Sequence, residues 1–183
     1  HLATALNLHI KCNATLSLYD TEIIDYFLKK KHTKISQMIT FIQKAIGENM
    51  NLFTNWILHW QYSSWHLSFW EKLHIFDFEE IWFGPIITDV VYAAYKCGYK
   101  DQSNGSIDWI YSFLEHYRKY SSLNNYENHS VPFIILLCFI TDLYIMLNEK
   151  DRLWGKWYDN HTIYLHYQEL IKFYKNLLSQ FKQ

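Results

Sequence analysis

Apolar residues recur at helical spacing along most of this chain. From Ile35 to Ile46 they fall at every third or fourth position, which predicts a helix with one buried face. The same spacing from Ile163 to Phe181 predicts the most regular amphipathic helix of the sequence. These two stretches indicate a fold that is built mainly from helices.

Shorter apolar stripes predict three further helices. The first follows a threonine near the start of the chain, and its stripe includes Leu28. The second is expected from Ile86 to Tyr95. The third runs from Ile107 to Tyr117, with Phe113 in its buried stripe and Ser106 as its N-cap.

The hydrophobic pattern changes in the middle of the chain, where short β-prone runs replace the helical spacing. These runs are Trp56 to Leu58, Leu67 to Phe69 and Leu73 to Phe76. Trp70 to Lys72 separates the last two runs and fits a tight hairpin turn. The predicted fold class is therefore mainly α with a small central β-hairpin insertion.

The longest apolar run, Val131 to Leu147, contains Asp142 and is shorter than the roughly 20 apolar residues that span a bilayer. It is therefore expected to be a buried core helix rather than a membrane span. A polar connector is expected from Ser121 to Ser130 in front of it, which would put Pro132 in its first turn.

Composition narrows the class of protein. A length of 183 residues, half of them apolar and 19% aromatic, is enough for one folded domain over residues 1–183. Only 5 Gly and 2 Pro interrupt the chain, which favours long helices over a sandwich of short strands. The 17 basic and 18 acidic residues leave no charge excess for binding nucleic acid. Cys12, Cys97 and Cys138 match no zinc or redox spacing, so a reducing cytoplasm is expected.

Candidate chemistry gathers around the β-prone runs. Asp77 follows the run that ends at Phe76, and a carboxylate at the end of a strand is well placed to hold a hard cation. His59 follows the first run and opens a polar loop, and His66 lies at the far end of that loop. The predicted hairpin would bring His66 close to Asp77, although a packed, hydrogen-bonded histidine is the alternative for His66 alone.

Three motifs follow one another between Asn55 and Asp89. They are His59-Trp60-Gln61 followed by His66, then Ile75-Phe76-Asp77-Phe78-Glu79, then Gly84-Pro85 followed by Asp89-Val90-Val91. This order resembles the catalytic and metal-binding segment of the aminoglycoside phosphotransferase and choline kinase family. That family has H-G-D-x-x-x-x-N, a hairpin, I-D-F/W-[ED], and G-D/P-x-x-x-D-L-A. The segment from Leu2 to His9 and the downstream helices are also similar to that family, so the resemblance spans nearly the whole chain.

The resemblance implies a role for five residues of this chain. Asp77 would hold the Mg²⁺ that bridges the phosphates of ATP. Asp89 would be a structural acid that orients the catalytic loop, and His59 would organise that loop. Gln61 stands at the position of the catalytic base, and His66 at the position of the second metal-binding side chain.

Two of these positions depart from the family pattern. The amide of Gln61 cannot accept a proton near neutral pH, and general-base catalysis typically contributes about 10²–10⁴-fold in rate. The imidazole of His66 is a poorer ligand for Mg²⁺ than an amide oxygen, although it suits Mn²⁺ or Zn²⁺. Trp60 adds a bulky side chain where the family has glycine. The catalytic loop is therefore predicted to be degenerate.

The resemblance also implies a kinase-like C-terminal lobe, with its catalytic and metal segment at residues 55–89. The chain has no Gly-rich loop, so the nucleotide-binding N-terminal lobe is expected to be absent from it, and because it starts at His1 a preceding part is expected. Three hypotheses remain open: a degenerate, pseudokinase-like protein, an active phosphotransferase of a small hydroxylated substrate, and a helical binding module. The expected partners are a small-molecule substrate, and an N-terminal lobe or protein partner, with no nucleic acid and no membrane.

Overall fold

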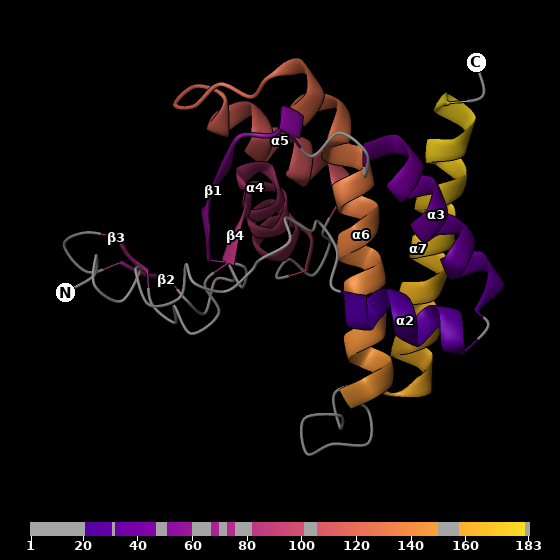
Figure 1. Cartoon of the computed structure of the whole chain (residues 1–183). Helices are drawn as coiled ribbons and strands as arrows, with labels where there is room; N and C mark the ends of the chain where they lie inside the picture. Colours follow the sequence, from indigo (N-terminus) through magenta and orange to yellow (C-terminus); the bar gives the residue numbers. More distant parts are fainter. Residues whose placement is uncertain are drawn as a thin grey trace.

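A computed structural model of the chain describes residues 21–30, 32–46, 51–59, 67–69, 73–75, 82–100, 106–149 and 158–181. The elements in chain order are α2 (Thr21–Lys29), α3 (Thr33–Ile46), β1 (Asn55–Leu58), β2 (Leu67–Phe69), β3 (Leu73–Ile75), β4 (Trp82–Pro85), α4 (Ile86–Ala94), the π-helix η3 (Tyr95–Lys100), α5 (Ile107–Tyr117), α6 (Asn125–Glu149) and α7 (Asn160–Gln180). The fold is mainly helical with small antiparallel β-pairs, which confirms the predicted fold class at this level (Figure 1).

Helix α6 is the central element of the molecule. It contacts α3 and α7 on one side and α4 on the other (Figure 1). Its side chains from Phe133 to Leu136 are all buried. Because successive residues of an α-helix are about 100° apart, four buried residues in a row cover most of its circumference. By length and composition α6 could also cross a membrane, but here 67% of its most apolar 18-residue window is buried within the protein.

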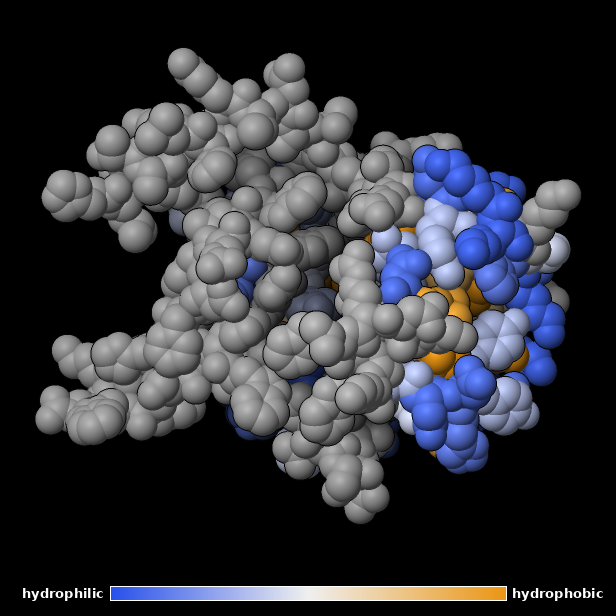
Figure 2. Space-filling view, turned by 90° about the horizontal axis from the view of Figure 1, so that it is seen from below, coloured by the Kyte–Doolittle hydropathy of each residue, from blue (hydrophilic) through white to orange (hydrophobic). Residues whose placement is uncertain are grey.

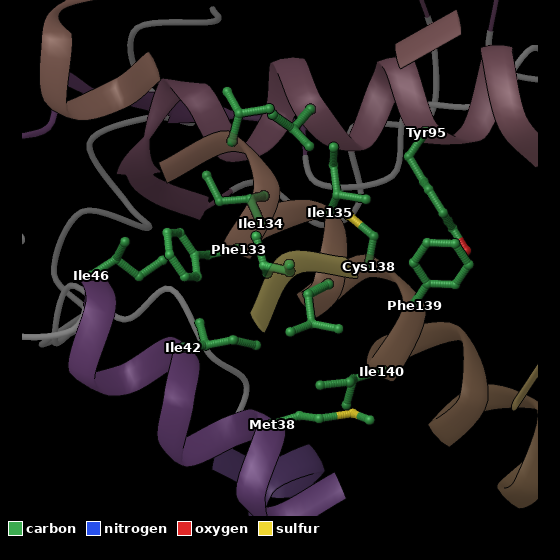
Figure 3. Close-up of a cluster of buried hydrophobic side chains, with 14 of the residues drawn as sticks. Met38, Ile42, Ile46, Tyr95, Phe133, Ile134, Ile135, Cys138, Phe139 and Ile140 are labelled. Carbon is green, nitrogen blue, oxygen red and sulfur yellow. The ribbon is translucent and has the colours of Figure 1, made fainter. Parts of the chain in front are cut away.

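Helix α3 supplies the other large part of the core. The stripe predicted between Ile35 and Ile46 is buried, which confirms that prediction. Met38, Ile42 and Ile46 from α3 face Phe133 and neighbouring residues of α6 (Figure 3). On the outside of α2, α3 and α7, hydrophilic residues surround the apolar ones, as Figure 2 shows from below.

Three predicted core positions are wrong. Leu28 of α2 is 51% exposed, Phe113 of α5 is 39% exposed, and Phe181, just beyond α7, is 45% exposed. Helices α2 and α5 each pack through a narrow line of residues four apart: α5, for example, buries Ile110 and Leu114. Side chains beside such a line face the solvent, because only one neighbouring layer covers a peripheral helix.

The start of α6 also differs from the prediction. The helix begins at Asn125, so the connector predicted up to Ser130 is too long, and Pro132 lies inside the helix rather than in its first turn. The cause is a reciprocal cap. The Glu127 N–H donates to Asn124 Oδ1 at 2.9 Å, and the Asn124 N–H donates to Glu127 Oε2 at 2.8 Å. This cap starts the helix in a stretch whose polar residues had indicated a loop.

The predicted hairpin is confirmed. β2 pairs with β3 in antiparallel register, with Leu67 opposite Ile75. The turn predicted between them lies outside the described residues. A second antiparallel pair, β1 with β4, was not predicted on the β4 side, because Trp82–Pro85 is short and contains both glycine and proline.

Helix α4 follows β4 without a loop and continues into η3. The helix predicted from Ile86 to Tyr95 therefore exists, but it does not end there, because a π-helix continues it from Tyr95 to Lys100. The next helix, α5, is capped as predicted, since Ser106 Oγ accepts the Asp108 N–H at 3.2 Å.

Candidate functional site

Strand β1 and the first turn of α4 are held against each other. β1 pairs with β4, which places Asn55 opposite Pro85. The chain then enters α4, and the Ile86 N–H donates to Thr54 O at 2.9 Å. The start of α4 therefore lies beside β1, so that side chains from its first turn can contact the end of the strand.

Asp89 uses this position to bind the residue that follows β1. The His59 N–H donates to Asp89 Oδ2 at 2.6 Å, and both residues are buried. The first turn is also closed by Thr88, whose hydroxyl donates to Pro85 O at 2.6 Å. The carboxylate lies near the N-terminus of α4, where the helix dipole favours negative charge. Asp89 therefore fixes the point at which the chain leaves β1.

The structure brings together two of the five predicted site residues, His59 and Asp89. Gln61, His66 and Asp77 lie outside the described residues. Within the described part of the chain, no group of three or more His, Cys, Asp or Glu side chains is arranged to hold a metal ion.

Glu127 holds the other end of β1. Its side chain is 1% exposed, and its Oε1 accepts the Thr54 N–H at 2.8 Å while Oε2 binds the cap of α6. Backbone N–H groups on both sides of β1 are thus bound by buried carboxylates. Glu127 was not predicted as a site residue, although the Asn-x-x-Glu pattern from Asn124 to Glu127 is typical of a helix cap.

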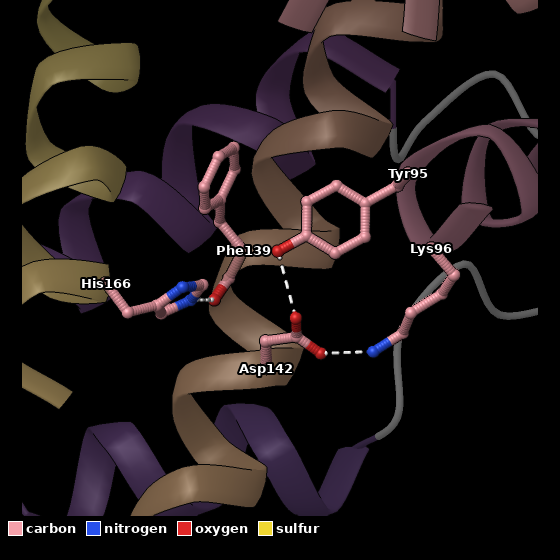
Figure 4. A network of polar contacts seen from close by, with 5 residues as sticks. All are labelled: Tyr95, Lys96, Phe139, Asp142 and His166. Carbon is pink, nitrogen blue, oxygen red and sulfur yellow. Dashed lines mark hydrogen bonds and ion pairs between the residues drawn. The ribbon is translucent and has the colours of Figure 1, made fainter. Parts of the chain in front are cut away.

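A third buried carboxylate, Asp142, lies in the middle of α6 (Figure 4). The Tyr95 hydroxyl donates to Asp142 Oδ2 at 2.9 Å, and the Lys96 ammonium donates to Oδ1 at 2.7 Å. Lys96 Nζ also lies 5.2 Å from the centre of the Tyr92 ring, within cation–π range. An acid inside an apolar helix needs a partner. The position of Asp142 within the apolar run from Val131 to Leu147 was therefore a signal in the sequence that a partner exists.

Electrostatics fix the protonation states in this cluster. Burial acts to lower the pKa of Lys96, but the negative charge of Asp142 and its hydrogen bond to the ammonium outweigh this effect, so the pKa lies above its usual value. Burial raises the pKa of Tyr92 to about 12. Burial, followed by the charge of Asp142, raises the pKa of the Cys138 thiol. At neutral pH the cluster therefore holds an ammonium ion, a neutral phenol and an unreactive thiol.

His166 links α7 to the same part of α6. Its Nε2 lies 2.8 Å from Phe139 O, and because a carbonyl oxygen only accepts, Nε2 carries the proton (Figure 4). The ring of Phe139 packs edge-on against Tyr95, with ring centres 5.3 Å apart. Phe139 therefore connects His166 of α7 to Tyr95 of the Asp142 cluster.

No protein-family model, no curated protein and no solved structure matches this chain. Its function is therefore inferred from its own residues and their geometry.

Proposed function

We propose that this chain is the C-terminal lobe of a kinase-like small-molecule phosphotransferase, of the aminoglycoside phosphotransferase and choline kinase type. The observation that carries the proposal is the 2.6 Å hydrogen bond from the His59 N–H to the Asp89 carboxylate. The resemblance assigns Asp89 to orienting the catalytic loop. A direct bond from this acid to the first residue of that loop is what such a role requires.

The order of the elements also supports the proposal. The chain runs through β1, the β2–β3 hairpin and β4 into α4, which carries Asp89. The resemblance requires a loop, a hairpin and a structural acid in the same order. The loop would follow His59, and the hairpin would separate it from the acid.

The catalytic loop of the proposed protein is degenerate, because Gln61 stands in place of the catalytic base. Phosphoryl transfer by the protein is therefore slow or absent. Mg²⁺ and ATP are its implied cofactors, with Asp77 and His66 as the proposed metal-binding side chains and Mn²⁺ or Zn²⁺ as further candidates. Phosphoryl transfer depends mainly on positioning and electrostatics, so loss of the base lowers the rate without removing the other parts of the site.

The test is ATP-dependent phosphoryl transfer by the full-length protein, measured as ADP release over a panel of small hydroxylated compounds with Mg²⁺ or Mn²⁺. Little turnover is expected from the natural sequence, and Gln61→Asp is expected to raise it by about 10²-fold or more. Asp77→Ala should abolish the gained activity, whereas Asp25→Ala, a change at an exposed acid, should leave it intact. Robust turnover by the natural sequence that is lost in Asp77→Ala would instead establish the second hypothesis, an active phosphotransferase.

A helical binding module without metal chemistry is the remaining candidate. It is favoured by the aromatic side chains of Trp109 on α5 and Tyr120 just beyond it, which are 56% and 90% exposed. Calorimetric titration with Mg²⁺, Mn²⁺ and Zn²⁺ separates the candidates. A metal site that is lost in Asp77→Ala is incompatible with the binding module.

A cytoplasmic location is part of the proposal. It is supported by the burial of α6, whose apolar residues contact other helices of the same chain. Under this proposal α6 is a core helix, and the expected partners are a small molecule and an N-terminal lobe or partner protein.

A further inference from the structure

Two carboxylate contacts bind α4, one in its first turn and one where it passes into η3. Asp89 and Lys96 are seven residues apart, which is about two turns, so both lie on the same side of the helix, about 10 Å apart along its axis. At one end, the Asp89 carboxylate accepts the His59 N–H. At the other end, the Lys96 ammonium donates to Asp142 on α6. The helix is therefore held both by the strand that it positions and by the core helix.

These contacts connect α6, β1 and the α4–η3 helix in a closed ring. Helix α6 binds the start of β1 through Glu127 and the Thr54 N–H. The end of β1 is bound to α4 through His59 and Asp89. The junction of α4 and η3 is bound back to α6 through Asp142. A change at Asp142 therefore has a direct route to His59 through η3 and α4, whereas Thr54 is bound to α6 at Glu127, in the first turn of that helix.

The π-helix is the part of this ring of contacts where the helix geometry can change. η3 begins at Tyr95 and includes Lys96, and these two residues are the donors to Asp142. π-helical turns are rare and are frequently found at functional sites. A π-turn holds one residue more than an α-turn, so relaxing it to α-helix would rotate α4 relative to the segment that follows.

We propose that Asp142 is a positioning residue for the end of β1, where the His59 amide binds Asp89. Its contacts with Tyr95 and Lys96 hold the junction of α4 and η3, and that junction sets the position of Asp89 against the His59 N–H. This inference goes beyond the proposed function and does not depend on phosphoryl transfer, because it concerns the geometry of one backbone amide.

Hydrogen exchange of single backbone amides in the full-length protein, measured by NMR, tests the proposal. Asp142→Asn removes the charge but keeps the side-chain shape, and it is expected to speed exchange of the His59 amide by about tenfold. The Thr54 amide is the internal reference, because it is also bound by a buried carboxylate but not through α4. Its exchange should change little.

Three further variants complete the test. Lys96→Arg keeps the charge, so the His59 amide should exchange as slowly as in the natural protein. Lys96→Met removes the charge and should speed that exchange. Lys29→Met is the matched control, since it removes an exposed 3.4 Å pair with Asp25 on α2. Lys96→Met also preserves the bond between Tyr95 and Asp142, so it gives the same comparison if Asp142→Asn does not fold.

Faster exchange at His59 alone supports the proposal. An equal rise at His59 and Thr54 would show that Asp142 contributes only to overall stability, and no change at His59 would show that the two sites are not coupled. Either of these results overturns it. Neither result bears on whether the protein transfers phosphate, which the ADP-release measurement decides separately.

Discussion

Asp89, Glu127 and Asp142 are carboxylates that the fold removes from water. A buried charge is costly unless donors satisfy it. Here backbone N–H groups satisfy Asp89 and Glu127, and a hydroxyl and an ammonium group satisfy Asp142. Each of the three carboxylates joins elements that are far apart in the sequence. These residues are therefore where single substitutions should have the largest and most specific effects.

Asp89→Ala should destabilise the protein by about 2–3 kcal/mol, because it leaves the buried His59 N–H without its charged acceptor. Asp89→Asn keeps an acceptor oxygen and should cost only about 1 kcal/mol. Urea unfolding measures both changes. Asp25→Ala, at an exposed acid of α2, should stay within about 0.5 kcal/mol of the natural protein. Equal losses for the alanine and asparagine variants of Asp89 would contradict the hydrogen-bond explanation.

Stability should fall at alkaline pH, partly because of Tyr92. Burial raises the pKa of Tyr92 from 10.0 to about 12 in the folded protein, so the unfolded chain loses this proton first. The stabilisation is fully present below pH 10 and is lost as the pH rises towards 12, by about 2–3 kcal/mol in total. The raised pKa values of Lys96 and Cys138 act in the same direction.

Tyr92→Phe isolates this contribution. Urea unfolding at about pH 9 and about pH 11.5 should show a smaller loss of stability in the variant than in the natural protein. Tyr164→Phe, at an exposed tyrosine of α7, is the matched control and should leave the pH dependence unchanged. An unchanged pH dependence in Tyr92→Phe would assign the alkaline loss to other groups.

At the scale of elements, periodicity was sufficient where one face of a helix is buried by several neighbours. The stripe of α3 was predicted residue by residue, and the β2–β3 hairpin followed from two short β-prone runs. Periodicity failed at peripheral helices, where Leu28 and Phe113 face the solvent. It also failed for β4, which exists because it pairs with β1 and not because of its own composition.

The candidate site was predictable only in part, because some of its residues depend on contacts between segments that are distant in the sequence. Motif spacing identified His59 and Asp89, and the structure joins them. Glu127 and Asp142 were missed, because a carboxylate acquires a structural role only when distant segments enclose it. The local sequence predicts a helix cap at Glu127 and an interrupted apolar run at Asp142. It does not predict that Glu127 binds the start of β1 or that Asp142 binds Lys96.

At the scale of the whole molecule, α6 connects the two halves of the described fold. It packs against α3 and α7 on one side and holds β1 and η3 through its carboxylates on the other. A membrane-spanning α6 would expose these apolar and charged side chains to lipid. A core helix and a membrane span therefore predict different accessibility for residues in the middle of α6.

Cys138 provides the measurement, because it lies in the middle of α6 and is buried. Its thiol should be labelled by maleimide at least about 10³-fold more slowly in the native protein than in concentrated urea, since labelling requires unfolding. Half-buried Cys97, located by peptide mass mapping, is the internal comparison and should react before global unfolding. The labelling of Cys138 should follow the urea transition of the whole protein. Labelling of Cys138 as fast as that of Cys97 in native protein, together with a need for detergent, would contradict the core position of α6.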